Sequence, residues 1–570
     1  MKKLIFLCLF SAYLSNSAYA GLNSVYNFAA VKKLLNGVFP KSTSFAVSYN
    51  CGDGKCVPQI GETSQTCPLD CKGAKIRSYN HQALCDKTKY IHEPQSIDEV
   101  SKLLKSIYES SDSKVRFVGA LHTTNTLICS DGYTISSKNI SKLSDVKIIE
   151  ENGETLVSTP GGIKLGTLGD HLAKNGYSLG FAYPMYRGVT IAGLLATGSH
   201  GSSRKHTAVS SQNIREISII DGTGEKHIIT KENNPELFRA AKVNLGMLGF
   251  VYNIKIKITP LFNIKMNVKK VENFVTKYKQ VKWGGPCDFE ILKWYPSINN
   301  AVKICGTKTN EKSYFGAESV AFGKDENNYM FPREKWIVKK ALSLARQHPF
   351  VANYLIKASY KKAEEKTGYS YQKISLKKNK INQEEVEANN IVGPANKMLH
   401  NRLTKGIFQS FSASDFSFSF PLSSAKDVLS DVKEFSEKYD YSFPFIGFYM
   451  RFTRAEGNNE GAFLSQIEPN SKKGQVYIMA EFFEYKFYNL EKSFLDQINK
   501  ERNLLLDMLI NKHNIRLHWG KSNKELFAKS DIQKVYGDNL EKFSEISRQM
   551  DPKGMFSNGF TQFTGLDSAK

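Results

Sequence analysis

Val118-Gly119-Ala120-Leu121-His122-Thr123-Thr124-Asn125 and the later run Val189-Thr190-Ile191-Ala192-Gly193-Leu194-Leu195-Ala196-Thr197-Gly198-Ser199-His200-Gly201 carry most of the information in this chain. Each is a run of small residues beside hydrophobic, strand-like sequence, and each contains a histidine. Exposed main-chain N–H groups in such turns form concave sites that bind phosphate or pyrophosphate without a positive side chain. Because the two loops lie far apart in the sequence, they indicate one long phosphorylated ligand, a dinucleotide, held by two parts of one domain.

The common dinucleotide-binding and nucleotide-binding signatures are absent from the sequence. There is no Gly-x-Gly-x-x-Gly between a strand and a helix, and no Gly-rich loop that ends in Lys-Ser or Lys-Thr at the required spacing. The dinucleotide site therefore belongs to neither a Rossmann domain nor a P-loop domain.

The loops resemble those of the flavin-linked oxidases of the vanillyl-alcohol oxidase (PCMH) type, most of all the sugar-1,4-lactone oxidases that act on gulonolactone, galactonolactone or arabinonolactone. In that family a Val-Gly-x-x-His-Ser loop surrounds the FAD pyrophosphate. The similarity runs from about Cys85 to Asn558 and is weakest between about Thr309 and Ser410. Further motifs that match in order are Ser130-Asp131-Gly132-Tyr133, Ala241-Lys242-Val243-Asn244-Leu245-Gly246-Met247-Leu248-Gly249, His518-Trp519-Gly520-Lys521 and Asp551-Pro552-Lys553-Gly554-Met555-Phe556-Ser557-Asn558.

The resemblance implies FAD as the cofactor, with His122 as the point of covalent attachment to the flavin ring. The alternative, that His122 only hydrogen-bonds nearby main chain, stays open. Relatives usually have glycine where Leu121 stands, so the loop is expected to differ there. The first loop and Thr197–Gly201 are expected to give main-chain donors to the pyrophosphate, and glycines to allow close approach. The residues expected to contact FAD are Val118, Gly119, Ala120, Leu121, His122, Thr123, Thr124, Val189, Gly193, Thr197, Gly198, His200, Gly201, Gly246, Gly249, Val251 and His518.

The segment His518-Trp519-Gly520-Lys521 matches the active-site loop of the family. By this resemblance His518 contacts the flavin ring, and Lys521 places a fixed ammonium where negative charge develops during reaction. Relatives also grip substrate hydroxyls with a Glu-x-Arg strand. Here Arg451 matches the arginine, but Tyr449 stands at the carboxylate position, and Glu481 on a neighbouring predicted strand is the candidate that restores a carboxylate.

The reaction implied by the resemblance is oxidation of a CH–OH carbon of a lactone or polyol, with hydride passing to the flavin. Dioxygen or a quinone is expected to reoxidise the cofactor. Two alternatives stay open: oxidation of a sterol or another apolar alcohol, and a non-catalytic flavin-binding protein.

Composition and charge limit the class of protein. The 570 residues predict two or three domains, and a content of 41% hydrophobic residues excludes global disorder. The formal charge of +23 comes from scattered lysines without an aromatic-interleaved basic strip, so no nucleic-acid partner is expected. Strand-like and helical stretches alternate, which predicts an α+β fold: a two-part FAD-binding domain and an antiparallel-sheet cap domain.

The N-terminal part has the features of an exported protein. Residues 1–20 combine Lys2 and Lys3 with an apolar stretch and an Ala-Tyr-Ala cleavage site, as in a signal peptide. Eight cysteines follow, an even number that predicts disulfides, with a local bridge expected between Cys287 and Cys305. The Cys51–Cys71 module is interpreted as a two-disulfide knot, while calcium binding by its acidic residues stays open. No metal is expected in the active site.

The expected organisation is a signal peptide (1–20), an extension with the cysteine module (21–85), a PCMH-type FAD-binding domain (86–262), a substrate or cap domain (263–510) with a helical insertion (310–410), and a C-terminal segment (511–570) that returns to the flavin site. A basic helical stretch in the insertion carries apolar residues that fit either a membrane surface or packing on the protein itself, and the packing alternative is favoured. These residues are Trp336, Ile337, Leu344, Val351, Leu355 and Ile356.

Overall fold

The computed structural model describes residues 76–78, 82–110, 112–184, 186–277, 285–313, 344–345, 348–365, 391–399, 413–439, 447–457, 460–485, 492–521 and 524–567. All of them belong to one of the two units into which the chain divides, formed by Gly73–Lys486 and Lys492–Lys570. The predicted signal peptide, the Cys51–Cys71 module and residues 314–343 of the predicted insertion lie outside the described residues. In the described part, no helix combines the length and the hydropathy needed to cross a bilayer.

The first loop leaves the end of a small parallel sheet. This sheet has the strand order β3-β5-β4, formed by Tyr90–His92, Tyr133–Ser136 and Val115–Val118. Helix α3 (Ile97–Ser110) connects β3 to β4, and its buried residues recur at three- and four-residue spacing on the face that packs on the sheet. Ser96 accepts a hydrogen bond from the Glu99 N–H at 3.1 Å, so the sequence Ser96-Ile97-Asp98-Glu99 caps the start of the helix.

A five-stranded antiparallel sheet forms the second part of the FAD-binding half. Its order is β10-β9-β11-β7-β6. The turn Asp221-Gly222-Thr223-Gly224 connects β9 and β10 as a hairpin. The strands are β6 (Lys147–Glu151), β7 (Glu154–Pro160), β9 (Ile214–Ile220), β10 (Lys226–Thr230) and β11 (Phe250–Lys257).

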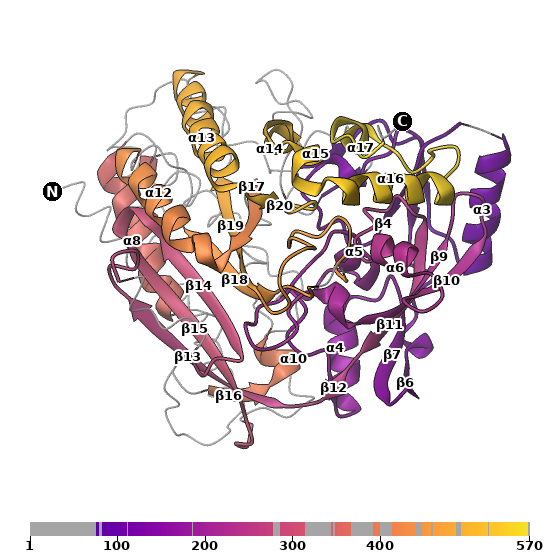
Figure 1. Cartoon of the computed structure of the whole chain (residues 1–570), viewed down its shortest axis with the longest axis horizontal. Helices are drawn as coiled ribbons and strands as arrows, with labels where there is room; N and C mark the ends of the chain where they lie inside the picture. Colours follow the sequence, from indigo (N-terminus) through magenta and orange to yellow (C-terminus); the bar gives the residue numbers. More distant parts are fainter. Residues whose placement is uncertain are drawn as a thin grey trace, which may run out of the picture. The chain divides into compact units, whose positions relative to one another are not determined.

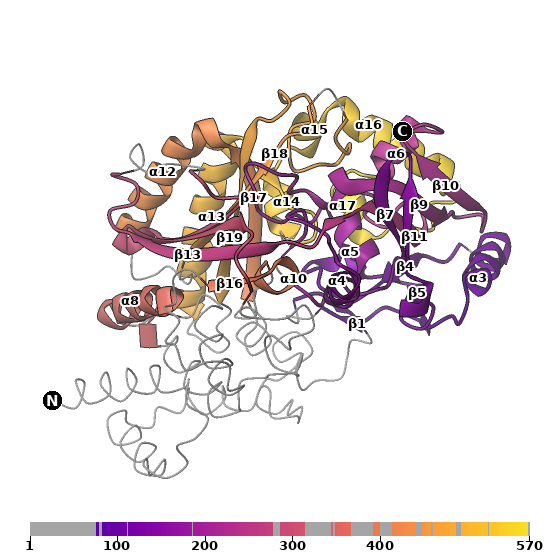
Figure 2. The ribbon, with the colours of Figure 1, turned by 90° about the horizontal axis from the view of Figure 1, so that it is seen from below.

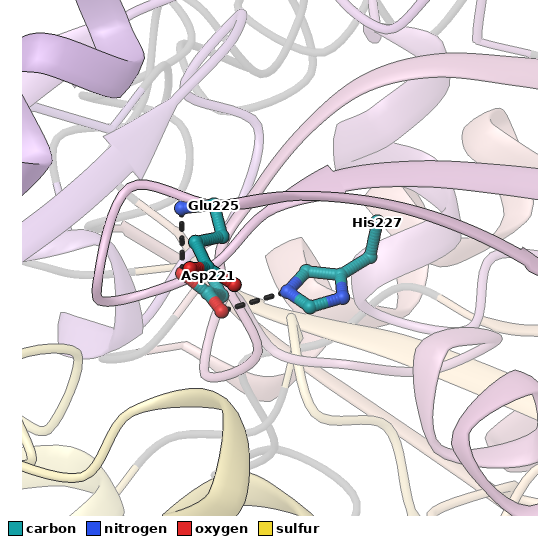
Figure 3. Close-up of side chains that lie close together, drawn as sticks. All are labelled: Asp221, Glu225 and His227. Carbon is teal, nitrogen blue, oxygen red and sulfur yellow. Dashed lines mark hydrogen bonds and ion pairs between the residues drawn. The ribbon is translucent and has the colours of Figure 1, made fainter.

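Asp221 holds the turn of this hairpin together (Figure 3). Its Oδ1 accepts hydrogen bonds from the N–H groups of Thr223 and Glu225 at 2.9 and 3.0 Å, and its Oδ2 lies 2.7 Å from His227 Nε2. Both carboxylate oxygens are thus engaged within the turn. The cluster of Asp221, Glu225 and His227 therefore stabilises the hairpin turn.

The cap half is an eight-stranded antiparallel sheet with the order β16-β13-β15-β14-β18-β19-β17-β20 (Figure 1). Its members are β13 (Asn263–Val271), β14 (Phe289–Tyr295), β15 (Asn300–Thr309), β16 (Ile391–Pro394), β17 (Ala413–Pro421), β18 (Phe448–Arg454), β19 (Val476–Tyr485) and β20 (Arg516–Leu517).

The two faces of this sheet differ in chemistry because side chains alternate along each strand. One face is apolar and packs on α12 (Ala425–Lys438) and α13 (Lys492–His513), which lie on the same side of the sheet in Figure 1. Phe416, Phe418 and Phe482 lie on this face and are at most 1% exposed. The other face carries the polar side chains of the candidate site.

Helices α8 (Pro349–Glu365) and α10 (Ala395–Met398) cover the β13–β14 end of that second face; Figure 2 shows α8 on the side of the sheet opposite α12. Val351 and Ile356 are each 7% exposed, and Ile356 packs in a cluster with residues of the sheet. The described members of the predicted apolar stripe therefore support packing on the protein rather than contact with a membrane.

The C-terminal segment crosses from the cap sheet to the FAD-binding half. After β20, α16 (Asp538–Met550) packs on α6 (Pro235–Ala241), and the Asp551–Asn558 motif follows. The Asn558 side chain donates hydrogen bonds to the carbonyl oxygens of Thr126, Leu127 and Cys129 at 3.3, 3.0 and 2.9 Å. This late motif thus holds the backbone that follows the first loop.

Two disulfides lie in the described part of the chain. The predicted Cys287–Cys305 bridge is present and joins the entry of β14 to β15. The second bridge, Cys85–Cys129, ties β2 (Leu84–Cys85) to the segment directly after the first loop. The other four cysteines that follow the predicted signal peptide lie outside the described residues.

Candidate active site

The two small-residue loops meet at Gly119 and Thr190. A Cβ atom on Gly119 would lie 2.1 Å from Thr190 Oγ1, so only glycine fits at this position. Thr190 is held in place because it is the N-cap of α5 (Ile191–Ala196), where its side chain accepts a hydrogen bond from Gly193 N. The two loops, which the sequence predicts to bind one dinucleotide, therefore pack directly against each other.

The first loop has the donor chemistry that a pyrophosphate requires. The N–H groups of Gly119, Ala120, Leu121 and Thr123 donate to no acceptor among the described residues. Successive unpaired N–H groups in a bend that includes a left-handed residue form an anion-binding nest. The described loop thus fits the phosphate part of FAD.

The second loop does not share this property, and the predicted donor role of its backbone is wrong at three positions. The N–H groups of Gly198, Ser199 and Gly201 already donate to main-chain carbonyls, those of Leu195, Leu194 and Ala182 respectively. Gly198 has φ +69°, and a Cβ on Gly201 would lie 1.9 Å from the Phe181 carbonyl oxygen. These glycines allow close packing of the chain against itself. In the sequence alone, such glycines cannot be distinguished from those of a phosphate-binding loop.

His122 lies against the segment that precedes Thr190. Its ring is edge-on to Tyr186 at a centroid distance of 4.6 Å, and a Cβ on Gly188 would lie 3.1 Å from His122 Nε2. Burial raises the pKa of Tyr186 to about 12, so its hydroxyl stays protonated at neutral pH. The imidazole is thus half-buried and fixed in orientation beside the nest.

Leu121 adopts φ +55°, a left-handed conformation that disfavours side chains branched at Cβ. Glycine adopts this conformation without strain, so the glycine that relatives usually have at this position would fit the loop as it stands. We expect Leu121→Gly to remain within about 1 kcal/mol of the parent stability, and Leu121→Val to lose about 1–2 kcal/mol more than the glycine variant. Denaturant unfolding of the two variants measures the difference, and equal stabilities would contradict the assigned conformation.

The His518–Lys521 segment contacts the end of the first loop. Thr124 N donates to Gly520 O at 2.9 Å, and Asn125 Nδ2 donates to Trp519 O at 2.6 Å. Gly520 also lies against the second loop, since a Cβ there would be 3.2 Å from Thr197 Cβ. Three separate segments, the last of which follows the first by almost 400 residues, therefore converge on one place.

Four charged side chains form a chain across the polar face of the cap sheet. Lys521 Nζ lies 2.8 Å from Asp415 Oδ2 and 3.4 Å from Glu481 Oε1. Arg451 Nη2 lies 3.1 Å from Glu481 Oε2. The three predicted residues Lys521, Arg451 and Glu481 are thus brought together, and Asp415 joins them.

The two carboxylates of this chain of charges differ in pKa. Burial raises the pKa of Asp415 to about 6, with Glu481 adding to the effect against the pull of Lys521. Burial would also raise the pKa of Glu481, but Lys521 and Arg451 outweigh it and hold that pKa below its ordinary value. Glu481 is therefore ionised at neutral pH, and Asp415 is the group that titrates.

His200 and His518 lie side by side beneath these charges, with ring centroids 6.2 Å apart. Burial lowers the pKa of His200 to about 4 and that of His518 well below its ordinary value, so both rings are neutral. His200 Nδ1 lies 3.0 Å from the Gly201 carbonyl oxygen, whereas His518 Nδ1 accepts the Gly520 N–H at 3.1 Å. The bonds assign opposite tautomers: Nε2 is an acceptor on His200 and a donor on His518.

The raised pKa of Asp415 predicts a pH dependence. Protonation below pH 6 removes the charge that holds Lys521, so the rate of anaerobic flavin reduction should fall as the pH drops through about 6. In Asp415→Asn this fall in rate near pH 6 should be absent, and its persistence would assign the titration to another group.

The same raised pKa also affects stability. Because the pKa of Asp415 is higher in the folded protein than in the unfolded chain, its contribution to the free energy of unfolding is greatest below about pH 4 and is lost as the pH rises towards 6.

Three further predicted cofactor contacts, Gly246, Gly249 and Val251, lie in closely packed parts of the FAD-binding half. Gly246 has φ +68° and lies against Arg116, whose guanidinium donates to Phe556 O at 2.7 Å and to Gly246 O at 3.3 Å. Gly249 has φ +128°, and a Cβ there would lie 2.1 Å from the Ile220 carbonyl oxygen, so strand packing accounts for this glycine. Val251 is 8% exposed and lies in the core, with its carbonyl oxygen close to Gly161.

Sequence reasoning missed Asp415 and Arg116. Asp415 lies on the polar face of a strand that alternates polar and aromatic residues, and an acidic residue on such a face was the available signal. Arg116 gave no signal, because a charged residue inside a short β-branched run is indistinguishable from one on an exposed edge.

Comparisons with known proteins agree with this geometry. Residues 88–230 match the family described as "FAD binding domain", and residues 254–563 match "D-arabinono-1,4-lactone oxidase". D-arabinono-1,4-lactone oxidase of Saccharomyces cerevisiae is 30% identical over 280 residues, 49% of this chain and 52% of that protein. L-gulonolactone oxidase of Mus musculus is 20% identical over 502 residues, 86% of this chain and 98% of that protein.

Solved structures show the same fold. A solvent-stable cholesterol oxidase has a TM-score of 0.66 at 14% identity, covering 86% of this chain and 97% of that one. Cholesterol oxidase from B. sterolicum has a TM-score of 0.63 at 14% identity, with coverage of 86% and 96%. At such low identity these likenesses concern the fold alone.

The aligned part spans about half the length of the fungal lactone oxidases, 52% for S. cerevisiae and 51% for Kluyveromyces lactis. The second family match nevertheless covers more than half of this chain, and the FAD-binding match precedes it without overlap. The chain therefore belongs to the D-arabinono-1,4-lactone oxidase family and carries an FAD-binding domain ahead of the part that defines that family.

Proposed function

We propose that this protein is an FAD-dependent oxidoreductase that oxidises a CH–OH carbon of a sugar lactone or polyol. The observation that carries the proposal is the convergence of the unpaired nest of the first loop with the cluster Asp415, Lys521, Glu481 and Arg451. Such charged and hydrogen-bonding groups suit a hydroxyl-rich substrate. They argue against a sterol, which offers one hydroxyl and a large apolar body.

The first loop would hold the pyrophosphate, and the convergence of Thr124, Thr197 and Gly520 would set the position of the ring system. When bound, FAD would supply the acceptor for the two electrons of the CH–OH carbon. Lys521 keeps a positive charge at this place because its ammonium lies between two carboxylates. A preorganised cation of this kind stabilises negative charge that develops in the transition state.

The two histidines give the site a donor and an acceptor at fixed positions. His518 Nε2–H can donate to a substrate or cofactor oxygen. His200 Nε2 can accept a hydrogen bond from the substrate hydroxyl, because burial and the neighbouring Arg451 lower the pKa of His200 to about 4 and keep its ring neutral. Arg451, paired with Glu481, can orient further hydroxyl groups.

The test is an anaerobic panel of aldonolactones, alditols and apolar alcohols, followed by flavin absorbance. We expect bleaching by at least one polyol or lactone and none by cholesterol. If no alcohol bleaches the flavin, the protein is a flavin-binding protein without this activity.

We further propose that His122 bonds covalently to the flavin. Support comes from its fixed ring beside the nest and from the family resemblance of the loop. The flavin should then migrate with the polypeptide in a denaturing gel and fluoresce after acid treatment. A His122→Ala protein that retained acid-resistant flavin would exclude this residue.

Export to an oxidising compartment and reoxidation by dioxygen or a quinone are also part of the proposal. The signal-like sequence of residues 1–20 and the disulfides Cys85–Cys129 and Cys287–Cys305 support export. N-terminal sequencing of the mature protein should begin near Gly21. Oxygen consumption compared with reduction of a soluble quinone identifies the acceptor.

A further inference from the structure

Thr124 is the residue of the first loop whose side chain contacts the cap sheet. It follows His122 by two positions and is 2% exposed. Its N–H donates to Gly520 O at 2.9 Å, and its Oγ1 lies within hydrogen-bonding distance of Asp415 Oδ1, Lys521 O and Gly520 O. Both hydrogens that Thr124 can donate are therefore used within the protein, and its hydroxyl faces the charged cluster.

The carboxylate of Asp415 is the acceptor that the Thr124 hydroxyl favours. A hydroxyl group has one hydrogen, so it donates to one of the three nearby oxygens at a time. Asp415 Oδ1 is the nearest of the three, whereas Lys521 O and Gly520 O lie at 3.0 and 3.3 Å. A hydrogen bond to an ionised carboxylate is also about twice as strong as one to a neutral carbonyl. The O–H of Thr124 therefore donates to Asp415.

Asp415 is held from two sides by segments that are remote from it in the sequence. It is 1% exposed and lies on β17. Thr124 of the first loop contacts Oδ1, and Nζ of Lys521, which follows β20, lies 2.8 Å from Oδ2. Rotation of the carboxylate away from Thr124 would also lengthen its contact with Lys521. The hydroxyl of Thr124 thus fixes the oxygen atom that binds the Lys521 ammonium.

The position of the Lys521 ammonium depends on this carboxylate. Glu481 is its other acidic partner, with Oε1 at 3.4 Å from Nζ, and Oε2 of Glu481 is paired with Arg451 at 3.1 Å. The Lys521 side chain is 27% exposed, so its contacts with buried carboxylates, rather than close packing, hold the ammonium in place. Asp415 makes the shorter of the two contacts.

We propose that Thr124 is a positioning residue of this site: by holding Asp415 it keeps Lys521 at the place where negative charge develops, and it couples the cofactor loop to the charged cluster. The inference rests on the proposed oxidation of a CH–OH carbon and adds a residue that acts in it through Asp415. It assigns the side chain of Thr124 to Asp415 rather than to FAD, the contact expected from the sequence.

The charge of Asp415 reports on this contact. Lys521 and Glu481 are the charged groups that act most on Asp415. Lys521 and the Thr124 hydrogen bond favour its ionised form, whereas burial and Glu481 favour the protonated form. Loss of the Thr124 hydroxyl should therefore raise the pKa of Asp415 from about 6 to about 7–8, as expected for a hydrogen bond to a charged group.

Thr124→Val removes the hydroxyl and keeps the shape of the side chain. In the FAD-loaded variant, the fall in the rate of anaerobic flavin reduction should move up by about 1–2 pH units. The rate at pH 7 should then be about 2- to 10-fold below that of the parent, and the rate at pH 9 at most about threefold below it. Thr124→Ser restores the hydroxyl and should keep the fall near pH 6.

Thr134→Val is the matched control. Thr134 on β5 is 0% exposed, and its Oγ1 has no hydrogen-bond partner among the described residues. This variant should leave the pH dependence unchanged. Thr124→Ala also removes the hydroxyl and takes the place of Thr124→Val if that variant fails to fold. A fall that stays near pH 6 without the hydroxyl would overturn the proposal.

An infrared titration tests the contact independently of catalysis. The C=O stretching band of the protonated Asp415 carboxyl, identified by its absence in Asp415→Asn, should lose half its intensity near pH 6 in the parent and near pH 7–8 in Thr124→Val. This shift without flavin reduction by any alcohol would retain the contact but reject the oxidation, and with it the role of Thr124 in that reaction. Flavin reduction by an alcohol, with a band that titrates alike in both proteins, would retain the oxidation and reject the positioning role.

Discussion

Lys521→Met should lower the rate of anaerobic flavin reduction by about 10²- to 10³-fold, the loss typical when one preorganised electrostatic group is removed from a site. The ammonium lies 2.8 Å from Asp415 and 3.4 Å from Glu481, so it needs no reorganisation when charge develops next to it. Methionine keeps the length of the side chain and removes the charge.

The substitution leaves Asp415 without its cation and could therefore also destabilise the fold. A lower rate of flavin reduction must be distinguished from such destabilisation. The raised pKa of Asp415 means that this carboxyl can take up a proton instead, which limits the cost to stability. Lys529→Met is the matched control, since Lys529 forms a 2.7 Å ion pair with Asp507 on α13, outside the cluster Asp415, Lys521, Glu481 and Arg451. Unchanged flavin reduction in Lys521→Met, with normal FAD content, would remove Lys521 from the reaction.

Gly119→Ala should destabilise the FAD-loaded protein by about 1–3 kcal/mol and weaken retention of the flavin at least about tenfold. The added Cβ would lie 2.1 Å from Thr190 Oγ1 and 2.9 Å from Thr190 Cγ2, so the two loops must separate. Separation displaces the nest of unpaired N–H groups that follows Gly119. Thermal unfolding and the ratio of flavin to protein absorbance measure the two effects.

A double substitution tests whether the clash with Thr190 causes the loss of flavin in Gly119→Ala. Thr190→Ala removes both atoms that would clash, so Gly119→Ala with Thr190→Ala should recover part of the flavin lost in Gly119→Ala alone. Gly559→Ala is the control for a glycine with nothing within 4 Å of the added Cβ, and it should retain the parent flavin content. A Gly119→Ala protein with normal flavin would show that the loops do not need this contact.

Local patterns determined a large part of the fold. The capping signal before α3, the hairpin at Asp221 and the alternating strands of the cap sheet depend on contacts between residues close in sequence, or on one strand having one buried face. Cys287 and Cys305 could be paired for the same reason, since they flank a single strand and lie 18 residues apart.

Other features depend on contacts between distant segments and could not be predicted from neighbouring residues in the sequence. The second loop was expected to offer main-chain donors, but its N–H groups are used by Leu194, Leu195 and Ala182. Small residues mark any close approach of the backbone, whether the neighbour is a ligand or the chain itself. The partner that occupies such a loop is visible only once the distant segments are in place.

By itself the sequence determined the two loops, the family resemblance and three of the charged residues of the site. The tertiary structure alone decided that Asp415 completes that cluster and that Arg116 joins three distant segments. The physical reason for the cluster is strand register: β17, β18 and β19 come together from residues 413 to 485, and a shift of one residue would turn the side chains of Asp415, Arg451 and Glu481 to the opposite face.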